Sequence, residues 1–279
     1  MSRSAPDGLP LRPGGAWSVE KLIYVERYAA AFTRAMKGKW DRLVYIDLLA
    51  GPGKGVRRDT GVEFDGSPLR ALKVKPPFDH LYLADVGRKV VNALERRISE
   101  SDRGRVSLFH GDCNDLADRV VAQLTGRTLG LAFVDPTGFE AKFPMFQAFA
   151  RRQIDVLFFF PDQIGIVRNL AQFATRSGAL MDGLMGDDSW RQTPQARLAG
   201  GHPLTPLESR DLARSWVSRF QANMATIGYR HYDHAEPEFR NRRNARMYHL
   251  LFFSRNALGL KIWRGIKRIQ PDNQRLLPL

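Results

Sequence analysis

The sequence contains a single cysteine, Cys113, among its 279 residues. One cysteine excludes an intramolecular disulfide and a metal cluster that needs several thiolates. No apolar run reaches the roughly 18 residues that a membrane-spanning helix requires, and the first residues, MSRSAPDGLPLRPGGAW, lack the apolar centre of a signal peptide. We therefore expect a cytoplasmic protein with no membrane segment, and a flexible N-terminal lead over residues 1–16.

Acidic residues are outnumbered: 29 Asp and Glu residues face 43 Lys and Arg residues, which gives a formal net charge of +14. A strongly basic protein favours polyanionic partners, and DNA or RNA is the first expectation. Arg240, Arg242, Arg243 and Arg246 form a basic cluster just before an apolar segment, and such a cluster suits phosphate groups. A solvated charged face without a ligand is the alternative interpretation of both observations.

Internal repeats are also absent, and short apolar segments alternate with helical patterns instead. Trp17–Met36 has apolar residues at helical spacing, with Ser18 as its expected N-cap. Segments rich in β-branched and aromatic residues predict strands. They cover 43–46, 80–85, 106–110, 129–134, 154–160, 227–232 and 247–253. Near-continuous apolar strands between helices predict a parallel sheet covered on both faces.

The chain divides into three parts after the lead. Residues 17–163 form the expected Rossmann-like cofactor-binding core, in which the glycine-rich, charged segment 52–66 is expected to be a long loop. Residues 164–225 lack a strand pattern and predict a helical insertion or lid, where residues 205–208 (TPLE) suit a capping box. Residues 226–279 supply late strands, at least one antiparallel at the sheet edge, and a last helix that complete the core. The predicted fold is doubly wound α/β.

The stretch Arg42–Gly55, RLVYIDLLAGPGKG, joins a short apolar strand to a glycine-rich turn. Asp47 ends the strand, and Ala50, Gly51 and Gly53 form a turn whose glycines let the backbone approach a ligand. A P-loop requires Ser or Thr after its lysine, and here a glycine follows; the dinucleotide fingerprint GxGxxG is also incomplete. The pattern resembles motif I of S-adenosylmethionine (SAM)-dependent methyltransferases, strand–Asp–x–x–Ala–Gly–x–Gly. A purely structural glycine turn is the alternative.

Four predicted strands end in a carboxylate, at Asp47, Asp85, Asp112 and Asp135. Ligands of open parallel sheets bind beyond the carboxyl ends of the strands, so we expect these acids to face one crevice. In a nucleoside cofactor site, Asp85 would accept hydrogen bonds from the ribose, Asp112 would contact the adenine amine, and the Cys113 N–H would donate to an adenine ring nitrogen. One alternative is that each Asp only caps the following helix. Another is a metal-dependent nuclease that uses the clustered carboxylates.

The segment that follows the fourth predicted strand reads DPTGF. It resembles the (Asp/Asn)-Pro-Pro-(Tyr/Phe) motif of methyltransferases that act on the amines of adenine or cytosine. The resemblance implies that Asp135 and the Pro136 carbonyl accept hydrogen bonds from the target amine, and that Phe139 stacks on the base. Thr137 stands in place of the second proline, and the aromatic residue comes one position late. A structural strand-to-helix turn is the alternative.

Several separate segments together resemble the three-Cys-motif partner (TcmP) proteins over residues 18–268. They are the helix with Tyr24 and Tyr28, YIDLLAGPG, GSPL at 66–69, VDPTG at 134–138, YHLLFFS at 248–254 and GLKIW at 259–263. The resemblance implies a Rossmann-like fold of the SAM methyltransferase type and a partner protein, encoded nearby, that carries three cysteines. It implies no particular substrate.

These patterns together predict a SAM-dependent methyltransferase that acts on a nucleic acid, at a base amine. Gly51 and Gly53 would surround the methionine end of SAM, and Asp47 would orient the glycine turn or the methionine amino group. No resident metal is expected in this interpretation. The alternatives are a non-catalytic methyltransferase-fold protein that binds a partner or nucleic acid, and the nuclease described above.

Overall fold

The computed structural model describes residues 5–161, 178–191, 205–233, 238–240 and 246–268. No helix in these ranges is both long and apolar enough to cross a membrane. The elements are β1 (Arg12–Gly14), α1 (Ala16–Met36), β2 (Arg42–Asp47), β3 (Lys54–Arg57), β4 (Glu63–Asp65), α2 (Ser67–Lys73), β5 (His80–Asp85), α3 (Arg88–Arg97), α4 (Glu100–Arg103), β6 (Val106–His110), α5 (Cys113–Gln123), β7 (Thr128–Val134), α6 (Phe143–Ala150), β8 (Gln153–Phe160), α8 (Gly178–Met185), η3 (Ser189–Arg191), α10 (Pro206–Thr226), β9 (His231–Tyr232), β10 (Glu238–Arg240), β11 (Arg246–Ser254) and α11 (Ala257–Lys267).

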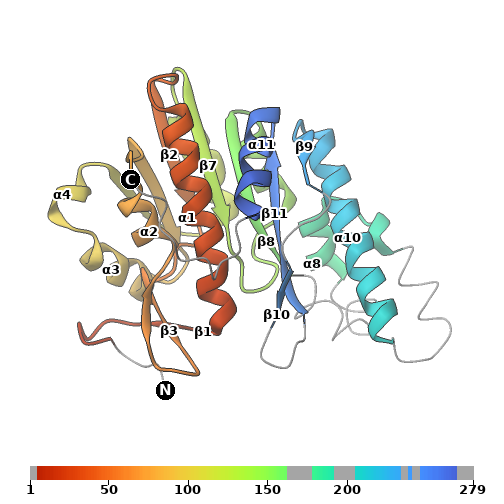
Figure 1. Cartoon of the computed structure of the whole chain (residues 1–279), viewed down its shortest axis with the longest axis horizontal. Coiled ribbons are helices and arrows are strands. Elements are labelled where there is room, and N and C mark those ends of the chain that lie inside the picture. The colour runs from red at the N-terminus through yellow and green to blue at the C-terminus, as the bar shows by residue number, and fades with distance from the viewer. Residues whose placement is uncertain (1–4, 162–177, 192–204, 234–237, 241–245, 269–279) are drawn as a thin grey trace.

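The central sheet has the strand order β10-β11-β8-β7-β2-β5-β6. The strands from β8 to β6 run parallel to one another, whereas β11 runs antiparallel to β8 and β10, and β9 pairs with the end of β11. Figure 1 shows α1 and α11 lying across one face of the sheet, with α3 and α4 at one end of the molecule and α10 at the other. The predicted doubly wound, mainly parallel α/β fold is therefore confirmed, including its antiparallel late strands.

Both faces of the sheet are covered, because successive strand residues point to opposite faces. In β2, Val44 and Ile46 belong to the apolar cluster that includes α5, α6, α8 and α10. Leu43 and Tyr45 belong to the cluster on the other face, which includes α1, α2 and α11. A strand covered on both sides has no polar face, and this explains why β2 reads as an unbroken apolar run.

β2 is the strand at which the order of the sheet reverses. From β2 the chain proceeds to β5 and β6 on one side, and it then returns to β7 and β8 on the other side. Ligands of open α/β sheets bind beyond the carboxyl ends of the strands at such a switch point. The topology therefore directs attention to the segments that follow β2 and β7.

A second sheet, which we call the small sheet, consists of β1, β3 and β4. β1 pairs parallel with β3, and β3 pairs antiparallel with β4. Segment 52–66, which was expected to be a long loop, therefore contains a β-hairpin. Its composition hides these strands, because the hairpin is completed by residues 12–14 from a distant part of the chain.

The N-terminal lead packs against the small sheet and the end of α3 from residue 5 onward, in contrast to the flexible lead expected from the sequence. Ala5 and Leu11 form a small buried cluster with Val56 of β3. Leu9 is also buried, and β1 contributes backbone hydrogen bonds to the small sheet. Burial of apolar side chains offsets the entropy that a free lead would keep.

Arg97, at the end of α3, connects this lead to the glycine turn. Its side chain is only 4% exposed. The guanidinium donates to both carboxylate oxygens of Asp7, at 2.9 and 3.0 Å, and to the carbonyls of Pro10 at 2.8 Å and Pro52 at 2.6 Å. The hydrogen bond from Arg97 holds the pKa of Asp7 at about 2. We call this set of contacts the Arg97 clamp.

The described parts of the segment 164–225 are helical, namely α8, η3 and α10. The capping box at the start of α10 is confirmed: Thr205 Oγ1 accepts the Glu208 N–H at 3.2 Å, and the Glu208 carboxylate accepts the Thr205 N–H at 2.9 Å. α10 buries Trp216 and Phe220 against the apolar cluster that also contains α8. The described helices of this segment thus extend the core.

Candidate functional site

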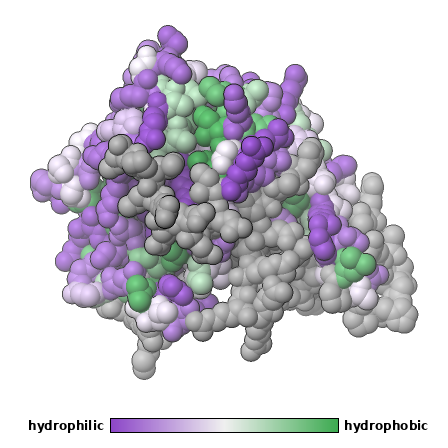
Figure 2. All heavy atoms as spheres, in the orientation of Figure 1, coloured by the Kyte–Doolittle hydropathy of each residue, from purple (hydrophilic) through white to green (hydrophobic). Residues whose placement is uncertain are grey.

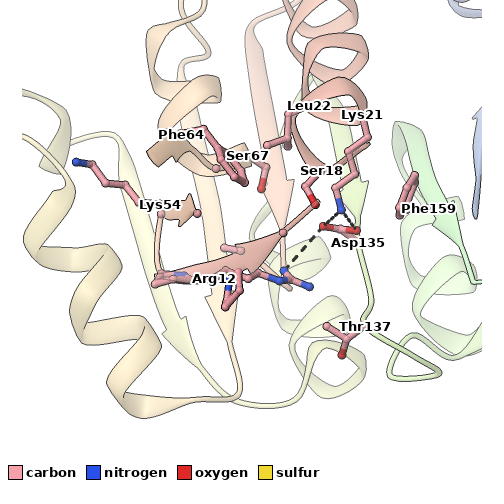
Figure 3. Close-up of a pocket in the computed structure, with 18 of the residues that line it drawn as sticks. Arg12, Ser18, Lys21, Leu22, Lys54, Phe64, Ser67, Asp135, Thr137 and Phe159 are labelled. Carbon is pink, nitrogen blue, oxygen red and sulfur yellow. Dashed lines mark hydrogen bonds and ion pairs between the residues drawn. The ribbon is translucent and has the colours of Figure 1, made fainter. Parts of the chain in front are cut away.

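A cavity of about 350 Å³ lies at the carboxyl ends of β2 and β7. Its walls come from α1, the glycine turn, the small sheet, the segment after β7, and β8 (Figure 3). The lining residues are Arg12, Pro13, Gly14, Trp17, Ser18, Lys21, Leu22, Ala50, Gly51, Pro52, Gly53, Lys54, Gly55, Arg58, Phe64, Gly66, Ser67, Asp135, Pro136, Thr137 and Phe159. The structure therefore places Ala50, Gly51 and Gly53 beside Asp135 and Pro136. Of the four strand-end acids that were expected to face one crevice, Asp135 alone lines this cavity.

The glycine turn needs its glycines for backbone reasons. Gly51 and Gly53 have φ values of +65° and +85°, a region that side-chain-bearing residues rarely adopt. A Cβ on Gly53 would also lie 3.0 Å from the Leu94 side chain. Asp85, at the end of β5, accepts the Gly51 N–H at 3.1 Å and the Gly87 N–H at 2.8 Å. Asp85 therefore fixes the turn from the side, and it does not line the cavity.

Asp47 lies beneath the glycine turn, fully buried. Its carboxylate accepts a hydrogen bond from Ser67 Oγ at 2.6 Å and from the Leu49 N–H at 3.2 Å. Burial raises the pKa of Asp47 to about 7, and the nearby Asp135 carboxylate adds to this rise, while the Ser67 hydrogen bond opposes it. In this arrangement Asp47 supports the floor of the cavity, because Ser67 lines it and Asp47 does not.

Asp135 and Lys21 form an ion pair inside the cavity (Figure 3). Both Asp135 carboxylate oxygens lie 2.6 Å from Lys21 Nζ, and Arg12 NH1 lies 3.8 Å from the same carboxylate. Lys21 Nζ also lies 5.1 Å and 4.4 Å from the ring centroids of Trp17 and Phe159, and such cation–π contacts stabilise a desolvated ammonium. Burial lowers the pKa of Lys21, and the Asp135 carboxylate opposes this change. The ion pair holds Asp135 in one orientation.

Lys21 was not predicted as a site residue, although the sequence contains a signal for it. Lys21, Val25 and Tyr28 recur at helical spacing and are all buried in α1. A lysine on the apolar face of a helix is rarely buried unless it is paired. The expected N-cap was also wrong: Gly15 caps α1, and Ser18 is a buried residue within the helix.

The turn after β7 is fixed by hydrogen bonds to Glu140. The Glu140 carboxylate accepts from Thr137 Oγ1 and from the Gly138 N–H. Phe139 packs against the core and does not line the cavity, unlike the stacking role that the sequence suggested. The aromatic residues that line the cavity are Trp17, Phe64 and Phe159. They come from distant segments, which local spacing could not reveal.

Asp112 and Cys113 lie outside the cavity lining, at the start of α5. Asp112 accepts the Asn114 N–H at 2.8 Å and is the N-cap of this helix, as the capping alternative expected. The Cys113 thiol is buried, donates to the Glu140 carbonyl at 3.7 Å, and has its pKa raised to about 12 by burial. These hydrogen bonds use the Asp112 carboxylate and the Cys113 thiol. The Cys113 backbone N–H, which was assigned to adenine from the sequence, takes part in neither of them.

The four strand-end carboxylates do not form a shared cluster. Among the residues that the structure describes, no group of three or more His, Cys, Asp or Glu side chains is arranged to hold a metal ion. Asp47, Asp85, Asp112 and Asp135 instead each have their own partners. The nuclease alternative therefore has no carboxylate cluster to support it in this part of the chain.

The predicted arginine cluster lies mostly beyond the described residues. Arg240 and Arg246 are paired in backbone register between β10 and β11. Arg242 and Arg243 lie outside the described ranges. The role of this cluster in phosphate binding stays a prediction.

Comparison with known proteins shows the fold. No family model and no curated protein matches the chain. A Legionella pneumophila protein described by the family model DUF519 is similar in structure, with a TM-score of 0.55, 14% sequence identity and 91% of each chain covered. A magnesium protoporphyrin IX methyltransferase from Synechocystis PCC 6803, solved with bound SAH, gives a TM-score of 0.38 and 13% identity over 85% of this chain and 86% of that chain. The first likeness shows a shared α/β fold, and the strand order and switch-point cavity agree with the Rossmann-like fold expected from the sequence.

Proposed function

We propose that this protein is a SAM-dependent methyltransferase whose substrate is a base amine of a nucleic acid. One observation carries the proposal: the glycine turn after β2 and the Asp135-Pro136 segment after β7 line the same cavity. Methyl transfer from a donor to an amine requires the two to be adjacent, so the donor site must lie beside the groups that hold the amine. The two sequence motifs resemble those of methyltransferases independently, and the fold places them together.

The residues around the cavity suit SAM. Gly51 and Gly53 offer backbone without Cβ atoms to the methionine end of SAM. Each Asp85 oxygen accepts one backbone N–H and keeps a further lone pair for a ribose hydroxyl. Asp112 follows the neighbouring strand, where the adenine would lie. When bound, SAM supplies an electrophilic methyl group.

The chain's own contribution to transfer is the positioning of the amine. An ionised carboxylate has about four acceptor sites, and Lys21 takes one on each Asp135 oxygen. The remaining sites and the Pro136 carbonyl would accept the two N–H groups of an exocyclic amine. These hydrogen bonds increase the electron density on the amine nitrogen and orient it. Lys21 acts through Asp135 and is a positioning residue in this scheme.

A base within a duplex cannot reach a recessed cavity, so the substrate must be single-stranded or must flip its base out of the stack. Trp17 and Phe159 line the cavity and present apolar rings close to Asp135. We assign to them the contact with the base that the sequence had suggested for Phe139. The net charge of +14 agrees with a polyanionic substrate.

We further propose, from the resemblance to TcmP proteins, that a three-Cys-motif protein is a partner. Its contribution is tested by including it in the assay below. The alternative hypothesis is a non-catalytic protein with a methyltransferase fold. This hypothesis predicts binding to nucleic acid or to a partner without affinity for SAM.

Two measurements test the proposal. Calorimetric titration with S-adenosylhomocysteine (SAH) should show binding, whereas NADH and Mg²⁺-ATP should not compete at comparable affinity. A methyl-transfer assay with radiolabelled SAM should label DNA or RNA, with or without the three-Cys protein. Asp135→Asn should abolish this label, and Asp118→Asn, on the exposed side of α5, should not. Label on protein or small molecules alone, with Asp135→Asn still active, would refute the assignment of the substrate.

A further inference from the structure

The small sheet places two arginines beside the cavity. Arg12 belongs to β1, Arg58 directly follows β3, and both line the cavity. The Arg12 side chain is 38% exposed, and Arg58 is also exposed. Asp135 is the one acidic residue among the described lining residues, and it has Lys21 at 2.6 Å and Arg12 at 3.8 Å as partners. The cavity therefore has an excess of positive charge on its solvent side.

Backbone contacts fix the positions of both arginines. Arg12 is in register with Gly55 across the β1–β3 pair. The Arg58 N–H donates to the Gly14 carbonyl at 2.9 Å, and the Arg58 guanidinium donates to the Pro13 carbonyl at 3.4 Å. A planar guanidinium on a fixed backbone matches the oxygens of a phosphate and loses little freedom on binding.

Two other basic residues of the small sheet are paired with carboxylates of the β3–β4 segment, whereas Arg12 has only a longer contact with Asp135, whose closer partner is Lys21. Arg57 lies 2.7 Å from Asp59. Lys54 lies 3.4 Å from Glu63, and Figure 3 shows Lys54 directed away from Asp135. By contrast, the guanidinium of Arg58 donates to the Pro13 carbonyl, and a carbonyl does not neutralise the positive charge of the guanidinium. The available charge is thus concentrated at the cavity.

We propose that Arg12 and Arg58 bind the phosphates of a single nucleic-acid strand next to the nucleotide whose base enters the cavity. The inference rests on the proposed function and assigns phosphate binding at the site to the small sheet. A base that contacts Asp135 within the cavity leaves its sugar and phosphates on the solvent side, where these two guanidinium groups lie. Binding would then combine a buried base with an anchored backbone, as stacking and basic grooves do in single-strand binding.

The test measures binding of a fluorescent single-stranded oligonucleotide of mixed sequence by anisotropy, over a series of salt concentrations. Arg12→Gln and Arg58→Gln are compared with Arg103→Gln. Arg103, on α4, has a side chain that is 58% exposed, and Figure 2 shows mainly hydrophilic side chains on this end of the molecule. All three substitutions remove one positive charge. SAH titration and unfolding curves of each variant accompany the binding data.

We expect Arg12→Gln and Arg58→Gln each to weaken binding about tenfold at low salt. Each should also lower the slope of log affinity against log salt by about 0.7, because one phosphate contact on a single strand is lost. The affinity of Arg58→Gln for SAH should stay within about twofold of that of the unchanged protein. The affinity of Arg103→Gln for the oligonucleotide should also stay within about twofold.

Three outcomes overturn the inference in distinguishable ways. Equal losses for Arg58→Gln and Arg103→Gln would show that only the overall charge matters. Loss of SAH affinity by Arg58→Gln with an unchanged salt slope would assign this arginine to the cofactor. Absence of oligonucleotide binding by the unchanged protein at low salt, with SAH still bound, would refute both this inference and the proposed nucleic-acid substrate.

Discussion

Asp135 directly follows β7 and Asp112 lies two positions after β6, yet these two acids, on opposite sides of β2, have different roles. Asp135, after β7, is buried against Lys21 and lines a cavity. Asp112, after β6, accepts the Asn114 N–H and caps α5. A position after a strand brings an acid to the same edge of the sheet in both cases, whereas the role of the acid depends on its partner. The partner of Asp135 is a lysine on α1, and the partner of Asp112 is the backbone of α5.

The largest expected effect concerns the ion pair. Lys21→Met leaves the Asp135 carboxylate buried without its partner, and Asp135→Asn does the same to the Lys21 ammonium. We expect each single change to lower the free energy of unfolding by about 3–5 kcal/mol. The double variant should recover much of the loss, because no unpaired charge remains. Urea denaturation of all four proteins measures the coupling, and losses that simply add would contradict a direct pair.

The second prediction concerns Asp47, which lies next to the same cavity. Its pKa is about 7 in the folded protein and near 3.8 in the unfolded chain. Between these values the folded state binds the extra proton, so the free energy of unfolding falls as pH rises from about 4 to about 7. The full change is at most about 4 kcal/mol, at about 1.4 kcal/mol for each pH unit.

Asp47→Asn should remove this dependence, since the amide does not titrate. The unfolding free energies of the variant and the unchanged protein, measured from pH 4 to pH 8, should therefore be closest at low pH and diverge as pH rises, with the variant the more stable protein at high pH. A difference that is constant over this range would show that Asp47 has an ordinary pKa.

The third prediction separates the two acids on the β5–β6 side. Asp85→Ala removes the acceptor of the Gly51 N–H, together with the proposed ribose contact. It should weaken SAH binding by about 1.5–3 kcal/mol, or roughly 10- to 150-fold. Asp112→Ala removes a helix cap and should cost about 1 kcal/mol of stability. Calorimetric titration with SAH and unfolding curves on both variants separate cofactor binding by Asp85 from helix capping by Asp112. A larger loss of SAH affinity for Asp112→Ala than for Asp85→Ala would contradict this assignment.

The smallest effect is expected within the glycine turn. Gly53→Ala places a Cβ 3.0 Å from Leu94 at a φ of +85°, so we expect a loss of about 1–2 kcal/mol in stability, and weaker SAH binding. Gly104→Ala is the control, because Gly104 has a φ of −63° and open space around its Cβ position. It should be neutral or slightly stabilising. Equal thermal unfolding midpoints for the two variants would show that the turn tolerates a side chain.

The sequence predicted those features that depend on local patterns. The apolar strands, the acids that end them and the capping box of α10 were all visible, because periodicity and capping act within a few residues. The Lys21–Asp135 pair joins residues 114 positions apart, and the small sheet pairs residues 12–14 with residues 55–57. Phe139 was chosen as the stacking residue from its spacing, and spacing along the chain cannot show which ring faces a cavity; Phe159 lines the cavity and Phe139 does not.

The Arg97 clamp connects the segment 7–14 to the binding site. Residues 12–14 wall the cavity, and the hydrogen bonds from Arg97 to Asp7 and Pro10 hold the segment that leads to them. Loss of residues 5–14 would remove Arg12 from the cavity wall, although both large apolar clusters consist of later residues. Without these residues the cavity would lose one wall and the positive charge of Arg12. The basic wall of the cavity thus depends on a buried arginine and a small apolar cluster that are separate from the two large clusters of the fold.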